Sequence, residues 1–341
     1  MLRIITLEEH YCDRDIAEAS REMSLAMSPY FAAAYEPDKG YSYSPAPEQE
    51  RNLGEERIRD MDRNGISMQV LSCLTAQNLP YGEAVSVVKE ANNRLKEAIS
   101  RYPDRLAAFA SLPTSHPEEA AEELERCVKE LGFVGAAICG RTNSGKEESG
   151  TDGCGFLDEP EYRPILSMAQ SLDVPLYLHP AVPPITVQRA CYDGLNPLVS
   201  ARFSTSAWGW HQETAIHLLH MILAGVFDCY PHLNIIAGHW GEMIPFYLSR
   251  LDQALPRGIT GLALDISGYF RRNVYITPSG MFDMNQLRYC VQVLGADRIL
   301  YAVDYPFIGN EKAAGFLEDA PLSQEDKEKI AYKNAELLLK L

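Results

Sequence analysis

Basic residues are scarce in this 341-residue sequence, in which 31 lysines and arginines stand against 47 aspartates and glutamates. The formal net charge of −16 argues against a nucleic-acid-binding protein, because phosphate backbones are bound by a basic face. A small anionic ligand is still compatible with this charge, since a few arginines in a cleft can reverse the local field. With 46% hydrophobic and 23% charged residues, the composition is otherwise that of an ordinary globular protein.

The sequence also contains no apolar stretch near the roughly 20 residues that span a bilayer. It shows none of the basic and apolar regions of a secretory signal, and none of its eight cysteines forms a Cys-x-x-Cys pair. We therefore expect a cytoplasmic protein that contacts no membrane and keeps its cysteines as free thiols. No Gly-x-Gly-x-x-Gly or Walker-type loop is present, which removes the best evidence for a nucleotide-binding open sheet.

Short apolar runs alternate with segments of helical periodicity along the chain. Several runs are too continuously apolar to leave one face in water, as is typical of parallel strands buried on both faces. Helices are predicted over 53–64, 117–131, 212–226 and 322–341. Eight strands are predicted, over 3–7, 68–73, 106–110, 134–139, 175–179, 233–238, 274–277 and 299–303. This alternation predicts an α/β fold, a single TIM-type (β/α)8 barrel domain over residues 1–341.

Three connections are longer than the few residues that usually join such elements. They are 11–51, 140–155 and 180–211, and each follows the carboxyl end of a predicted strand. Barrel enzymes build their active sites at this face. The segment 11–51 is predicted to be a lid over that face or an arm for dimerisation, and the two roles can coexist.

Ionisable side chains follow four of the predicted strands. The first strand leads into Glu8, Glu9 and His10; residues two apart on a strand share a side, so Glu8 and His10 should face one space. Glu9 is expected to be packed or salt-bridged outside that space. Three later strands are followed by His179, by His239 with Glu242 just beyond, and by Asp304. Barrel strand ends converge on one mouth, and two histidines with two carboxylates suit a divalent metal such as Zn²⁺ or Mn²⁺.

His211 is ambiguous. It begins a helix just after the long connection 180–211, from which it could reach the mouth of the barrel. A structural histidine at this position is the alternative.

Several stretches resemble the amidohydrolase-2 branch of the amidohydrolase superfamily, which contains aminocarboxymuconate-semialdehyde decarboxylase and metal-dependent hydroxybenzoate decarboxylases. They are LEEHY, GEERIRDMDRNGISMQVLS, VPLYLHP, AWGWHQETAIHLL, HLNIIAGHWGEMIPF, VYITPSGMF and DRILYAVDYPF, between Leu7 and Phe307. Many superfamily members carry His-x-His on the first strand. The Glu8-x-His10 of this chain is instead similar to the motif of γ-resorcylate-type decarboxylases, a group that the chain resembles together with the 2,3-dihydroxybenzoate and 5-carboxyvanillate enzymes.

The resemblance implies specific roles for these residues. One divalent metal ion per chain, Zn²⁺ or Mn²⁺, would be held by Glu8, His10, His179 and Asp304. The residues beside the substrate would be the pair His239 and Glu242, Arg57 at the substrate carboxylate, and Trp210 on the substrate ring. For Trp210, the alternative is a core aromatic residue that flanks a helix. A homodimer or homotetramer is expected from the resemblance alone.

The implied activity is that of a carboxy-lyase, a nonoxidative decarboxylase of a hydroxylated aromatic acid of the ortho-hydroxybenzoate type. The substrate would chelate the metal through its carboxylate and hydroxyl oxygens while Asp304 protonates the ipso carbon. The alternative is a metal-dependent, lactonase-like hydrolase in which Asp304 acts as the base, and CO₂ release distinguishes the two. A catalytically silent barrel is disfavoured, because every expected ligand is present.

Overall fold

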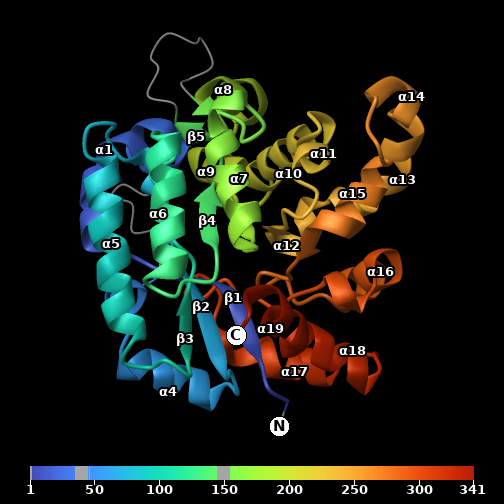
Figure 1. The fold of residues 1–341 in the computed structure, drawn as a ribbon. Helices are drawn as coiled ribbons and strands as arrows, with labels where there is room; N and C mark the ends of the chain where they lie inside the picture. Colours follow the sequence, from blue (N-terminus) through green and yellow to red (C-terminus); the bar gives the residue numbers. More distant parts are fainter. Residues whose placement is uncertain (1, 35–44, 46, 144–153) are drawn as a thin grey trace.

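The computed structural model describes residues 2–34, 45, 47–143 and 154–341, and it has short parallel strands at its centre with helices outside them (Figure 1). The first sheet consists of β1 (Ile5–Tyr11), β2 (Met68–Cys73) and β3 (Leu106–Ala108). The second sheet consists of β4 (Ala136–Cys139), β7 (Leu176–His179), β8 (Ile235–Ala237) and β9 (Val274–Ile276). Every pairing within these two sheets is parallel. A separate antiparallel pair is formed by β5 (Thr142–Asn143) and β6 (Cys154–Gly155).

Three isolated parallel bridges join the two sheets into a closed barrel. Ala110 pairs with Ala136, which connects β3 to β4. Ile276 pairs with Ile299, and Ala302 pairs with Leu7 of β1. The segment 299–303 therefore occupies the eighth strand position of the barrel, which we call the eighth stave. It makes only bridges and no continuous strand. The predicted (β/α)8 barrel is confirmed.

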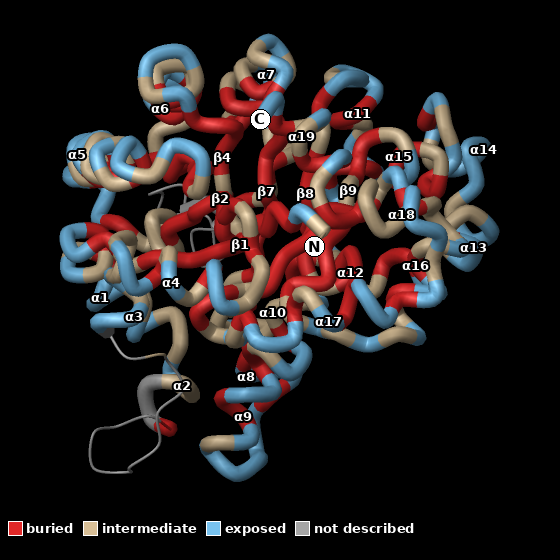
Figure 2. Tube along the Cα trace, turned by 90° about the horizontal axis from the view of Figure 1, so that it is seen from below, coloured by how far each residue is buried: buried red, intermediate tan, exposed pale blue. Residues whose placement is uncertain are grey.

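Burial explains why the strand sequences are so continuously apolar. Every residue of β1 and β2 is buried, because one face of each strand points into the barrel and the other packs against helices. The interior is filled by side chains such as those of Leu7, Val70 and Leu300. Seen from below, the buried strands form a central region, and the helices around them expose their outer sides (Figure 2).

Helices surround the barrel and fill its connections. From α1 to α10 they are α1 (Arg14–Met27), α2 (Pro29–Ala34), α3 (Pro47–Arg51), α4 (Glu55–Arg63), α5 (Ala84–Ile99), α6 (Pro117–Lys129), α7 (Arg163–Leu172), α8 (Ile185–Tyr192), α9 (Pro197–Ser204) and α10 (Gly209–Leu223). The remainder are α11 (Val226–Cys229), α12 (Gly238–Glu242), α13 (Ile244–Ala254), α14 (Arg257–Thr260), α15 (Ile266–Asn273), α16 (Met284–Leu294), α17 (Ala313–Glu318), α18 (Gln324–Glu328) and α19 (Asn334–Leu339). No helix in the described part of the chain is long and apolar enough to cross a membrane.

Two of the predicted helices are interrupted. The segment predicted over 212–226 begins earlier, at Gly209, and α10 ends before Gly225, whose positive φ of 76° breaks the helix ahead of α11. The segment predicted over 322–341 is divided by a π-helical turn, Lys329–Lys333, between α18 and α19. Apolar periodicity predicted both segments but not these interruptions.

The first strand is longer than predicted and contains a bulge. It continues through Tyr11 instead of ending at Leu7, and its register with β2 shifts between Thr6 and Glu9. Glu8 lies in this bulge with a φ of 64°. A bulge re-aims the side chain that it carries, so Glu8 and His10 are both presented from within the strand.

The long connections add helices at the barrel mouth. The described part of 11–51 contains α1, α2 and α3, whereas residues 35–44 and 46 of this predicted lid or arm lie outside the described residues. Most of 140–155 also lies outside them. The connection 180–211 carries α8 and α9, which extend away from the barrel (Figure 2).

Candidate active site

Four predicted side chains meet at the carboxyl ends of the barrel strands. One potential ligand atom from each of Glu8, His10, His179 and Asp304 lies within 4.8 Å of the others. His10 Nε2 is 3.1 Å from Asp304 Oδ1, and His179 Nε2 is 3.3 Å from Glu8 Oε1. The residues come from β1, from the end of β7 and from the segment that follows the eighth stave. The fold therefore gathers the constellation that the sequence predicted.

The hydrogen bonds around this cluster fit a metal ion. Glu8 Oε1 and His10 Nε2 are buried and have no hydrogen-bond partner among the described residues, an arrangement that costs free energy unless a cation satisfies both atoms. The other ring nitrogens are held: His10 Nδ1 lies 2.9 Å from Ser72 Oγ, and His179 Nδ1 lies 2.8 Å from the Pro180 carbonyl oxygen. Such contacts orient metal-binding imidazoles. Two imidazole nitrogens and two carboxylates suit Mn²⁺ or Zn²⁺.

Burial keeps His179 neutral. It lowers the pKa of this side chain well below its usual value, and the nearby His10 and His239 act in the same direction. Because the Pro180 carbonyl can only accept a hydrogen bond, the proton of the neutral ring lies on Nδ1. The lone pair of Nε2 is then free to bind a metal.

Two hydroxyl groups at the site were missed by the sequence analysis. Those of Tyr177 and Ser279 both donate to Glu8 Oε2. Tyr177 lies two residues before His179 on β7, so strand alternation alone places the two side chains on the same side. Ser279 follows β9, and no sequence pattern predicted that its side chain would reach the site.

Beside the four-residue cluster lie two histidines that share one carboxylate. His239 Nδ1 is 2.8 Å from Glu242 Oε1, and His211 Nδ1 is 2.8 Å from Glu242 Oε2. The predicted pair is thus assembled, and the ambiguous His211 reaches the site. Burial opposes a charge on His239, but the carboxylates of Glu242 and Glu8 outweigh this effect and raise its pKa to about 10. His239 is therefore a hydrogen-bond donor at both ring nitrogens.

A cavity of about 500 Å³ opens onto both groups. Its lining includes His179, His239 and Asp304, together with Trp210 and His211. This volume lies in the range of small-molecule sites. Trp210 is therefore in a position to contact a ligand, and its indole N–H lies 3.1 Å from His211 Nε2.

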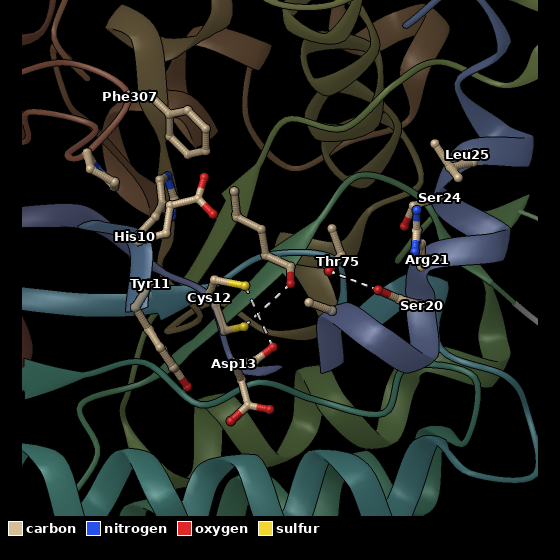
Figure 3. Close-up of a pocket in the computed structure, with 15 residues that line it drawn as sticks. His10, Tyr11, Cys12, Asp13, Ser20, Arg21, Ser24, Leu25, Thr75 and Phe307 are labelled. Atoms are coloured by element: carbon tan, nitrogen blue, oxygen red, sulfur yellow. Dashed lines mark hydrogen bonds between the residues drawn. The ribbon is translucent and has the colours of Figure 1, made fainter. Parts of the chain in front are cut away.

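A smaller cavity of about 300 Å³ is lined by His10. Figure 3 shows His10 and Phe307 at one end of it and the side chains of α1, including Ser20 and Leu25, at the other. Ser20 Oγ donates to Thr75 Oγ1 at 3.2 Å in the lining of this cavity. The described part of 11–51 thus forms a wall beside the site, and its role as a lid or arm stays a prediction.

Arg57 has partners other than the predicted one. It is 1% exposed, its Nε donates to Gln69 Oε1 at 2.7 Å, and its Nη1 donates to the His10 carbonyl at 3.0 Å. Its guanidinium lies 4.8 Å from the centre of the Tyr305 ring. Arg57 lines neither of the two cavities at the site. The geometry therefore does not support a direct contact with a substrate carboxylate and gives Arg57 a role in holding the backbone at His10, because its guanidinium is buried against Gln69 and the His10 carbonyl.

Glu9 points away from the cluster, as predicted. It accepts the backbone N–H groups of Val303 at 3.0 Å and Tyr305 at 3.1 Å. Burial raises its pKa to about 8, although these hydrogen bonds and the charge of Arg57 oppose that shift. Glu9 thus joins β1 to the eighth stave.

A closed α/β barrel with a histidine–carboxylate cluster at its strand ends defines a class of protein, the metal-dependent barrel enzymes. The sequence model of the family described as Amidohydrolase matches residues 50–341. The chain belongs to the amidohydrolase family.

Individual relatives narrow this class. The chain is 35% identical to Gamma-resorcylate decarboxylase from Polaromonas sp. (strain JS666), over 99% of this chain and 98% of the relative. Dihydroxybenzoic acid decarboxylase from Polaromonas sp. JS666, with bound manganese and the inhibitor 2-nitroresorcinol, is 34% identical with a TM-score of 0.86, over 100% of this chain and 98% of that one. A mutant 5-carboxyvanillate decarboxylase from Novosphingobium aromaticivorans, with manganese and 3-methoxy-4-hydroxy-5-nitrobenzoic acid, is 30% identical with a TM-score of 0.86, over 100% and 97%. The expectation of a carboxy-lyase of the amidohydrolase superfamily is confirmed.

Proposed function

We propose that this chain is a metal-dependent nonoxidative decarboxylase of a benzoic acid with a hydroxyl group ortho to its carboxylate. The observation that carries the proposal is the gathering of four ligand atoms within 4.8 Å, two of them buried without a hydrogen-bond partner in the described structure. The adjoining cavity of about 500 Å³ has room for one substituted ring. The relatives named above are decarboxylases, and two bind manganese together with a hydroxylated aromatic ligand.

Glu8, His10, His179 and Asp304 would hold one divalent ion, and Mn²⁺ is the first to test because it is bound in two relatives. When bound, the ion supplies Lewis-acid attraction for the oxygen atoms of the substrate. The chain contributes a buried, preorganised donor set, in which hydrogen bonds from the imidazole Nδ1 atoms to the Ser72 hydroxyl and to the Pro180 carbonyl orient the rings.

Asp304 is the proton donor in this proposal. Its side chain is 19% exposed and lines the main cavity, whereas that of Glu8 is 1% exposed. The proton of the Asp304 carboxyl moves to the ring carbon that bears the carboxylate. The bond to that carboxylate then breaks, its electron pair restores the aromatic ring, CO₂ leaves, and water reprotonates Asp304.

His239 orients the substrate and stabilises negative charge. Its Nδ1 is held by Glu242, so its Nε2–H is free to donate to a ring hydroxyl. His211 holds the second oxygen of Glu242 and limits the rotation of that carboxylate. Trp210, in the wall of the same cavity, packs against the ring. Binding and orientation of this kind convert bound substrate into a reactive arrangement.

The test is CO₂ release from protein loaded with Mn²⁺ or Zn²⁺. The panel contains 2,6-dihydroxybenzoate, 2,3-dihydroxybenzoate and 5-carboxyvanillate, with 4-hydroxybenzoate as the matched control that lacks an ortho hydroxyl. We expect about one metal ion per chain and CO₂ only from ortho-hydroxy acids. Metal without CO₂ from any acid, together with lactone hydrolysis, would replace this proposal with the hydrolase alternative. The proposal includes a homodimer or homotetramer, which light scattering tests.

A further inference from the structure

A cluster of three buried hydroxyl groups surrounds one oxygen of Glu8. Tyr177 lies on β7, and Thr277 and Ser279 follow β9; all three residues are at most 2% exposed. The hydroxyls of Tyr177 and Ser279 both donate to Glu8 Oε2. Thr277 Oγ1 lies 2.7 Å from Ser279 Oγ and 3.2 Å from Tyr177 Oη. We call these three residues the hydroxyl cluster.

The backbone sets the direction of the hydrogen bonds in the hydroxyl cluster. The His239 N–H donates to Ser279 Oγ at 3.0 Å, and an amide can only donate. Because the Ser279 hydroxyl donates its own hydrogen to Glu8, its remaining lone pair accepts the hydrogen of the Thr277 hydroxyl. The chain of donors therefore runs from Thr277 through Ser279 to Glu8. The Tyr177 hydroxyl supplies the second donor to the same carboxylate oxygen.

The two oxygens of Glu8 consequently have different surroundings. Oε2 accepts two hydroxyl donors, whereas Oε1 has no hydrogen-bond partner among the described residues. Oε1 lies 3.3 Å from His179 Nε2 and 3.9 Å from His239 Nε2. This division leaves a single oxygen of Glu8 directed at the ligand cluster.

We propose that Tyr177, Thr277 and Ser279 are positioning residues that make Glu8 a single-oxygen ligand of the metal. This inference rests on the proposed function. Two hydrogen bonds withhold Oε2 from the cation, and a carboxylate that binds through one oxygen leaves coordination positions for two substrate oxygens. Without these donors Glu8 is free to chelate through both oxygens or to turn away. The network also joins the metal site to the backbone of His239 through Ser279.

The test is the affinity of the variants Tyr177→Phe and Ser279→Ala for Mn²⁺, measured by competition with a fluorescent chelator. Loss of contacts that orient a metal ligand typically costs 10–100-fold in affinity, and we expect a weakening of about this size. Tyr269→Phe is the matched control, because Tyr269 is also buried and its hydroxyl donates to a carboxylate, that of Asp228. Its affinity for Mn²⁺ should equal that of the unaltered protein.

A double-variant cycle shows whether the effect passes through Glu8. In a Glu8→Gln background, Tyr177→Phe should weaken Mn²⁺ binding no further. Circular dichroism checks folding, and Thr277→Val substitutes for any member that does not fold. Unchanged affinity in the Tyr177 and Ser279 variants, or an equal loss in Tyr269→Phe, would overturn this inference while leaving the proposed function intact. Failure of the unaltered protein to bind Mn²⁺ would overturn both.

Discussion

At the scale of single residues, exposure distinguishes the carboxylates at the site. Glu242 is buried, and its two oxygens are each taken by one imidazole, that of His239 or that of His211. Glu8 is buried with one oxygen bound by hydroxyl groups. Asp304 alone among these three is partly open to the main cavity, with 19% of its side chain exposed. That exposure is the reason why the proposed mechanism assigns the proton donor role to Asp304.

We predict that Asp304→Asn lowers kcat by about 10²–10⁴-fold, the usual contribution of a positioned acid. The amide of asparagine retains the shape of the side chain and one oxygen that can bind a metal ion. It cannot supply the proton. The measurement is CO₂ release, with metal content determined on the same sample. Asp173→Asn is the control, because Asp173 is a surface residue with 69% of its side chain exposed. Near-normal kcat in the Asp304 variant would refute its role as acid.

Individual side chains differ in how well the sequence predicted them. Glu8 and His10 were predicted from strand alternation, although the bulge at Glu8 sets the direction of that side chain. Tyr177 could have been found by the same rule on β7. The partners of Arg57 were not predictable, because Gln69 and His10 lie 12 and 47 residues away in the sequence and are brought to it only by the fold. A sequence pattern indicates the residue type that a site uses, but not which neighbour occupies its donors.

At the scale of elements, the turn after β8 has an unusual backbone. His239, Trp240, Glu242 and Met243 all have positive φ values, between 48° and 65°, and Gly241 has a φ of 74°. Such conformations cost free energy and persist where the surrounding structure enforces them, commonly at functional sites. Here the turn directs His239 and Glu242 toward one another, three residues apart.

We predict that Gly238→Ala, at the start of this turn, weakens Mn²⁺ binding. An added Cβ would lie 2.9 Å from Ser279 Oγ, 3.0 Å from Tyr177 Oη and 3.1 Å from Glu8 Oε1, so Glu8 and its donors must shift. Chelator competition measures the affinity. Gly258→Ala serves as the control, because a Cβ there meets nothing within 4 Å. Equal affinities in the two variants would show that the site tolerates the displacement.

The sequence predicted the existence of the strands better than the residues at which they begin and end. Seven of the eight predicted runs contain a strand, since strands buried on both faces are rich in apolar residues, and the eighth, 299–303, makes only bridges. The bulge at Glu8 was not visible, because an extra residue in a buried strand leaves the apolar pattern unchanged. The break at Gly225 depends on a positive φ that glycine permits but does not require.

At the scale of the whole molecule, a metal ion bound at the proposed site would increase the stability of the folded state. A ligand that binds only the folded state stabilises it by about 2.7 kcal/mol at 100 times its Kd. We predict that Mn²⁺ at this concentration raises Tm by a few degrees and that a chelator reverses the rise. Glu8→Gln should show a much smaller shift in the same thermal scan. A Tm that is indifferent to Mn²⁺ and to the chelator would contradict the proposed metal site.

Stability should also depend on pH through His217. Its Nε2 accepts the Leu157 N–H at 2.9 Å, and burial lowers its pKa to about 3. Below pH 6.5 the unfolded chain binds a proton that the folded chain does not accept until about pH 3, so stability falls as the pH falls through this window. The slope from this group is about 1.4 kcal/mol per pH unit.

We therefore expect His217→Gln, which keeps an acceptor but does not titrate, to lose less stability than the unaltered protein between pH 6.5 and 5. Urea unfolding at several pH values measures this difference. His232→Gln, at an exposed position, is the control and should follow the unaltered protein. Parallel pH profiles for all three proteins would show that His217 does not contribute to the acid sensitivity.

The junction at which β1 pairs with the segment 299–303 closes the barrel and has a consequence for biosynthesis. We call this junction the seam. Glu9 accepts a hydrogen bond from Val303, 294 residues later, and Leu7 pairs with Ala302 at the same junction. The ligand cluster straddles this seam, since His10 lies on its first stave and Asp304 follows its last. A nascent chain on the ribosome therefore carries an incomplete donor set until Asp304 has been translated. Metal acquisition should follow the synthesis of Asp304, and a polypeptide released before this residue should not retain the ion.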